Sequence, residues 1–130
     1  MSKNLIDTNL IIRFLVNDNP KKATKVEKLL KDKNNQNVLL DTVIAEIIWV
    51  LNSYYNLKKH DIIEKIEALI HVDTIECNEI VIGRTLTIWK EYNISFIDAY
   101  LVAVADLGGM TLYSYDKNFD SIDTVIVKEP

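Results

Sequence analysis

Four acidic side chains stand where they could bind a divalent cation: Asp7, Glu46, Asp98 and Asp116. Asp7 closes a short strand candidate at residues 4–7, and Asp116 follows another strand candidate at residues 110–114. The carboxyl ends of parallel strands meet at one edge of a sheet, where open α/β folds hold their functional crevice. Asp7 and Asp116 are therefore predicted to project toward the same rim.

The other two acids belong to predicted helices. At about 100° per residue, Asp98 lies within roughly 60° of Leu101 and Val102, on the apolar face of its helix. A carboxylate there is costly unless it is paired, hydrogen-bonded or metal-bound. Glu46 neighbours Val43 and Val50, which places it toward the margin of an apolar face.

Each acid also has a structural interpretation, which the sequence leaves open. Asp7 could cap the helix that follows it, and Asp116 could begin a turn. Ser95 and Asp98 have the spacing of a capping box, and Glu46 could be a partly buried, ion-paired residue.

Taken together, the four acids favour a metal site. Carboxylates packed together repel and raise one another's pKa, and a hard cation with oxygen ligands removes that conflict. Mg²⁺ usually keeps several waters, which leaves room for a phosphate oxygen and an attacking water. The chemistry predicted from the residues is metal-assisted phosphodiester hydrolysis.

The elements that must position these acids alternate between short strands and helices. Such a pattern predicts an α/β fold with a mainly parallel sheet covered by helices on both faces. Helices are expected at residues 8–16, 20–33, 42–55, 58–71, 78–92 and 95–107, and strands at 4–7, 37–40, 73–75, 110–114 and 124–127.

Composition limits the class of protein. With 130 residues, the chain is expected to form a single domain over residues 1–130. The net charge of −4 argues against a module that binds nucleic acid by bulk charge alone. One cysteine excludes an intrachain disulfide. The opening residues do not resemble a signal peptide, and no stretch approaches the ~20 apolar residues of a membrane span, so we expect a cytoplasmic protein.

Four sequence blocks, at residues 5–15, 45–51, 96–103 and 112–120, resemble those of the PIN-domain family, particularly the VapC-type toxins of toxin–antitoxin pairs. The third block, Phe-Ile-Asp-Ala-Tyr-Leu-Val-Ala, is the most distinctive. The resemblance gives Asp7 and Asp98 the principal metal-ligand roles, and Glu46 and Asp116 the other two acid positions. It also implies supporting roles for Asn9, Ser114 and Asp120.

The resemblance implies a three-layer α/β/α PIN-like fold with a central, mainly parallel sheet. It further implies an endoribonuclease that uses Mg²⁺ or Mn²⁺ and acts on an RNA substrate, a homodimer, and a cognate antitoxin that blocks the site. Alternatives are a PIN ribonuclease of RNA processing that is no toxin, and a PIN scaffold acting only through protein contacts. A phosphoacceptor receiver domain is disfavoured, because such a domain would need adjacent acids after the first strand and a Lys-Pro pair after the last.

Other residues allow further interpretations. Six lysines between residues 21 and 33 could steer RNA, although a solvated helix face is the more usual explanation of such a stretch. Arg13 could contact a phosphate or a partner acid, or form a structural ion pair. Trp49 could belong to a partner surface, but core packing is the default expectation for Trp49 and Trp89. The structural residues are expected to include His60, His71 and Cys77.

Overall fold

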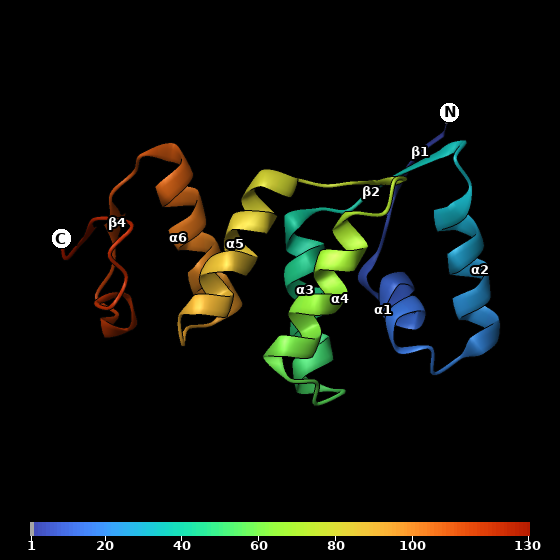
Figure 1. The fold of residues 1–130 in the computed structure, drawn as a ribbon, viewed down its shortest axis with the longest axis horizontal. Helices are drawn as coiled ribbons and strands as arrows, with labels where there is room; N and C mark the ends of the chain where they lie inside the picture. Colours follow the sequence, from blue (N-terminus) through green and yellow to red (C-terminus); the bar gives the residue numbers. More distant parts are fainter. Residues whose placement is uncertain (1) are drawn as a thin grey trace. The chain divides into compact units, whose positions relative to one another are not determined.

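The strands pair in parallel in the computed structural model, which describes residues 2–130 (Figure 1). Two compact units, Met1–Asn78 and Glu79–Pro130, account for the chain, and each contains one sheet and its own helices. This combination of helices and parallel strands confirms the predicted α/β fold class. None of the helices within residues 2–130 has the length and apolar character needed to cross a membrane.

The first unit contains a three-stranded sheet in the order β1-β2-β3, formed by Ser2–Leu5, Asn35–Val38 and Ile75–Glu76. Pairing continues past the strands, because the Ile6 amide donates to the Val38 carbonyl at 3.0 Å and the Leu39 amide to the Glu76 carbonyl at 2.8 Å. The carboxyl ends of all three strands therefore lie at one edge of this sheet.

A chain of polar side chains crosses the same sheet. Asn4 donates its amide to Asn37 at 3.1 Å, Asn37 donates to the Thr74 hydroxyl at 3.2 Å, and Thr74 donates to the Leu30 carbonyl at 2.6 Å. Asn37 is fully buried, so these bonds offset the cost of removing its amide from water.

Four helices complete the first unit: α1 (Thr8–Val16), α2 (Pro20–Lys31), α3 (Asp41–Ser53) and α4 (Lys59–Ile70). Helix α1 packs against α2 and α3, and α3 packs against α4 (Figure 1). Apolar residues recur at helical spacing, so each helix has an apolar face. Branched aliphatic side chains on these faces pack against one another. The fully buried members include Ile11, Ile44, Ile47, Ile62 and Ile66.

The second unit pairs α5 (Glu79–Glu91) with α6 (Phe96–Gly108). Trp89 and Phe96 meet edge to face with ring centroids 5.5 Å apart, which fixes the beginning of α6 against the end of α5. Helix α6 is followed by the C-cap residue Gly109, whose φ of 62° suits glycine. Strands β4 (Leu112–Tyr113) and β5 (Val127–Lys128) pair in parallel, with the short 3₁₀ helix η1 (Lys117–Phe119) between them in the sequence.

Several strand bounds and one burial expectation from the sequence were wrong. The strands expected at residues 4–7 and 124–127 lie at Ser2–Leu5 and Val127–Lys128. The strand expected at residues 37–40 lies at Asn35–Val38, because the polar chain at Asn37 lets three polar residues form a strand. Trp49, expected in the core, is 66% exposed on α3, whereas Trp89 is buried as expected. Helix α3 buries Ile48 and Leu51, whereas Trp49, which lies between them in the sequence, is exposed to solvent.

Candidate functional site

Asp7 lies at the carboxyl edge of the three-stranded sheet, between β1 and α1. It occupies the N-cap position of α1 with extended backbone angles, but its side chain makes no capping hydrogen bond. The carboxylate is exposed and forms no ion pair or hydrogen bond with any described residue. The capping interpretation therefore does not account for this aspartate, which leaves its oxygens available to a ligand.

A surface pocket of about 390 Å³ opens beside Asp7. Helices α1 and α2 form its walls, and all of its lining residues belong to the first unit. Asp7 is its sole carboxylate, since the lining consists of Asp7, Asn9, Leu10, Arg13, Lys22, Lys25 and Val26. The predicted supporting residue Asn9 thus shares a pocket with the acid that it was expected to support.

Arg13 is held at this pocket by a fixed ion pair. Its Nη1 donates to both carboxylate oxygens of Asp18 at 3.0 Å, and the Tyr55 hydroxyl donates to Asp18 Oδ2 at 3.0 Å. The hydrogen bond from Arg13, and then that from Tyr55, keeps the pKa of Asp18 below its usual value. The same hydrogen bond raises the pKa of the Arg13 guanidinium. Arg13 therefore has the structural partner that the sequence left open.

This ion pair predicts a pH dependence of stability. Because the pKa of Asp18 is lowered by folding, its contribution is present above the unfolded pKa and is lost as the pH falls through the folded pKa. We expect Asp18→Asn to lower the melting temperature at about pH 7, and to lower it by a smaller amount at about pH 3, below the ordinary Asp pKa of about 3.9. Tyr55→Phe keeps the ion pair, so it should lower the melting temperature less than Asp18→Asn does. Thermal unfolding monitored by circular dichroism checks this, and an equal difference at both pH values would contradict it.

Glu46 is an exposed residue of α3. Its helix neighbours Val43 and Val50 are half-buried and Ile47 is buried, so Glu46 lies at the margin of the apolar face as expected, with its side chain exposed. No described residue forms an ion pair with it, so the salt-bridge interpretation is not supported. Helix α3 begins just beyond the carboxyl end of β2 and packs against α1, the helix that follows Asp7.

Asp98 stands in the first turn of α6. The Ser95 hydroxyl caps the helix by accepting from the Asp98 amide at 3.1 Å, which is one half of the predicted capping box. The other half is absent among the described residues, because the Asp98 carboxylate forms no hydrogen bond or ion pair there. Asp98 is half-buried, next to the fully buried Ala99. A half-buried carboxylate without a partner is costly, so its position favours a ligand.

Asp116 has the turn role that the sequence left open. Its carboxylate accepts from the Asn118 amide at 2.9 Å and caps η1, while its own amide donates to the Ser114 hydroxyl at 2.9 Å. A capping aspartate keeps lone pairs free for another ligand, because one hydrogen bond uses only part of its acceptor capacity. Asp120 is exposed and ends η1.

The predicted quartet divides between the two units. Asp7 and Glu46 belong to Met1–Asn78, and Asp98 and Asp116 belong to Glu79–Pro130. Within its own unit, each acid is exposed or half-buried and open to a ligand. The gathering of all four around one cation stays a prediction.

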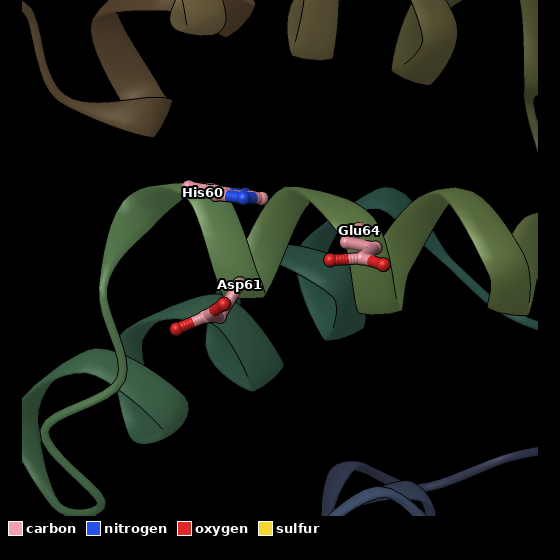
Figure 2. A group of neighbouring side chains, drawn as sticks. All are labelled: His60, Asp61 and Glu64. Atoms are coloured by element: carbon pink, nitrogen blue, oxygen red, sulfur yellow. The ribbon is translucent and has the colours of Figure 1, made fainter.

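A second group of potential ligands lies on α4, where sequence reasoning expected only structural residues. His60, Asp61 and Glu64 hold their ligand atoms within 4.8 Å of one another at the beginning of this helix (Figure 2). The i, i+4 spacing of His60 and Glu64 was the signal that could have found them. All three are exposed, and exposed acids often lie this close without an ion, so the group alone does not indicate a site.

Solved structures with a similar chain path include three toxin–antitoxin proteins. A toxin–antitoxin complex from Klebsiella pneumoniae shares 18% identity, with 100% of each chain covered and a TM-score of 0.36. VapBC2 from Rickettsia felis, bound to a promoter DNA fragment, shares 18% identity over 99% of this chain and 98% of the other, with a TM-score of 0.41. The sarcin–ricin loop cleaving toxin VapC20 from Mycobacterium tuberculosis shares 19% identity over 92% of this chain and 94% of the other, with a TM-score of 0.43. These likenesses are too remote to say more about this chain. The search of curated proteins found no match.

Comparison with protein-family models gives a definite assignment. The model described as PIN domain matches residues 5–125, which is most of the chain and includes Asp7, Glu46, Asp98 and Asp116. The match begins at the strand that leads to Asp7 and ends beyond the turn that Asp116 caps. The chain therefore belongs to the PIN domain family.

Proposed function

We propose that this protein is a divalent-cation-dependent endoribonuclease that hydrolyses RNA phosphodiester bonds in the cytoplasm. One observation carries the proposal: Asp7, in a chain of the PIN domain family, presents an unpaired carboxylate to a pocket that three cationic side chains and Asn9 also line, beside the apolar Leu10 and Val26. An anionic substrate fits such a lining, and a free carboxylate fits a cation that would bridge protein and phosphate.

The donor set suits Mg²⁺ or Mn²⁺. All four proposed ligands are carboxylates, the hard oxygen donors that these cations prefer. Neither Asp7 nor Asp98 has a competing hydrogen bond to its carboxylate among the described residues. We propose that Asp7 and Asp98 hold the cation, while Glu46 and Asp116 hold a second cation or orient water, with the whole chain acting as one domain.

The chain's own groups would each contribute one task. A bound divalent cation would activate water and stabilise the charge that develops on the phosphate. Asp7 and Asp98 would fix the position of the reacting phosphate through that cation. Asn9 lines the same pocket and would orient the phosphate or a water by hydrogen bonding. Ser114 already positions the Asp116 backbone, and Asp120 ends the same short helix.

The toxin assignment is a finer proposal. The four motif blocks resemble VapC-type toxins, so we propose a cognate antitoxin that blocks the site, and a homodimer in solution. A PIN ribonuclease of RNA processing is the alternative. A neighbouring reading frame that encodes a short DNA-binding protein, and co-purification of that protein with this one, would support the toxin assignment over the alternative.

The test is RNA cleavage by protein stripped of metal and then supplied with Mg²⁺ or Mn²⁺. We expect no cleavage with a chelator, recovery with either cation, and loss of cleavage in Asp98→Asn. Asp106→Asn is the matched control, because Asp106 lies on the same helix but is paired with Arg84 at 2.9 Å. Cleavage that survives the chelator, or an Asp98→Asn variant that folds and cleaves normally, would overturn the mechanism.

A further inference from the structure

Positive charge is concentrated on one helix of this acidic protein. The chain as a whole carries −4, yet α2 contains five lysines and a single glutamate. The glutamate, Glu27, is already paired with Lys31 at 2.5 Å. A helix with this balance attracts anions locally even when the net charge of the protein repels them.

Two of the five lysines differ from the others in position. Lys22 and Lys25 line the pocket that contains Asp7, whereas Lys21, Lys28 and Lys31 do not line it. Their i, i+3 spacing puts them side by side on the edge of α2 that faces α1. Neither has an ion-pair partner among the described residues.

The third cation of the pocket is already engaged. Nη1 of Arg13 donates to both carboxylate oxygens of Asp18, and the negative charge of this carboxylate offsets the positive charge of the guanidinium. Lys22 and Lys25 are therefore the two uncompensated cations that line the same pocket as Asp7.

We propose that Lys22 and Lys25 form a phosphate-binding wall for single-stranded RNA, holding the backbone beside the nucleotide that is cleaved at Asp7. This inference rests on the proposed ribonuclease function and adds the surface along which the substrate runs. Lysine ammonium groups contact phosphates without reading the bases, so the wall sets affinity and register rather than sequence preference.

The first test is RNA binding without cleavage. A chelator removes divalent cations, and fluorescence anisotropy then measures the Kd of a labelled 12-nucleotide single-stranded RNA at several salt concentrations. Each lost contact with a single strand should cost about fivefold in affinity at 0.1 M salt, so Lys22→Gln/Lys25→Gln should weaken binding about 25-fold. The slope of log K against log salt should fall by about 1.4.

The matched control is Lys21→Gln/Lys28→Gln, which removes the same charge from the same helix away from the pocket. It should weaken binding less than about threefold, because it changes only the long-range attraction. Equal losses in the two double variants would overturn the proposed wall and leave a diffuse basic helix. No measurable RNA binding by the unmodified protein would overturn it as well.

A cleavage assay separates this inference from the proposed function. With Mg²⁺ or Mn²⁺ present, Lys22→Gln/Lys25→Gln should raise KM and leave kcat at saturating RNA nearly unchanged. Cleavage by the unmodified protein with an unaffected KM in the variant would reject the wall and keep the ribonuclease. If only Lys22→Gln/Lys25→Gln loses RNA binding, and neither the unmodified protein nor any variant cleaves RNA, the wall is supported and the ribonuclease function is rejected.

Discussion

Replacing Asp7 by Asn is expected to slow metal-dependent RNA cleavage by about 10²–10³-fold, since a bound cation supplies several kcal/mol of charge stabilisation in the transition state. The substitution removes one negative oxygen and keeps the shape of the side chain. Stability should hardly change, because the Asp7 carboxylate makes no capping bond and Asn is an equally good N-cap residue. The measurement is single-turnover cleavage together with thermal unfolding.

The matched control for Asp7 is the exposed group on α4. His60→Ala/Glu64→Gln removes two of its three potential ligands and should leave both cleavage and metal dependence unchanged. If this double variant loses activity while Asp7→Asn retains it, the cation lies on α4 and the assignment of Asp7 is wrong.

Phe96→Ala should lower the free energy of unfolding by about 3–5 kcal/mol, the usual cost of emptying a buried aromatic site. Phe96 is buried, begins α6 and packs edge to face on Trp89, so its loss opens a cavity beneath the turn that carries Asp98. That cost is a large part of the 5–15 kcal/mol that stabilises an average domain.

Denaturant unfolding, with fluorescence and circular dichroism as probes, measures the effect of Phe96→Ala. Phe96→Leu is the control, since it keeps most of the buried volume and should cost much less. A loss below about 1 kcal/mol for the alanine variant would mean that the α5–α6 packing closes over the missing ring. Cleavage should fall in proportion to the unfolded fraction in both variants.

The sequence predicted helices well where their apolar residues recur on one side. Helix α1 has the expected bounds, and α2, α4 and α6 differ by one or two residues at an end. Strand β2 was displaced by two residues in the prediction, since Asn35, Gln36 and Asn37 look like a loop until their partners are known. Hydrogen bonds from residues more than thirty positions away decide that strand, and no local pattern contains them.

The acids themselves could be predicted, but their surroundings could not. Helix α3 is apolar on so many sides that periodicity alone could not show that Glu46 and Trp49 face solvent. The lysines of α2 looked like an ordinary solvated face. Only the packing of α2 against α1 shows that Lys22 and Lys25 share a pocket with Asp7.

The buried amide of Asn37 also helps to fix the register of the strands. Because side chains alternate between the faces of a strand, a slip of one residue would turn this amide away from Asn4 and Thr74. A buried amide without partners costs roughly 1–3 kcal/mol, so misaligned pairings are penalised while the native one is not. The register of β1 against β2 fixes where Asp7 lies at the edge of the sheet. That register is therefore set by an asparagine in the neighbouring strand, which lies far from the proposed chemistry.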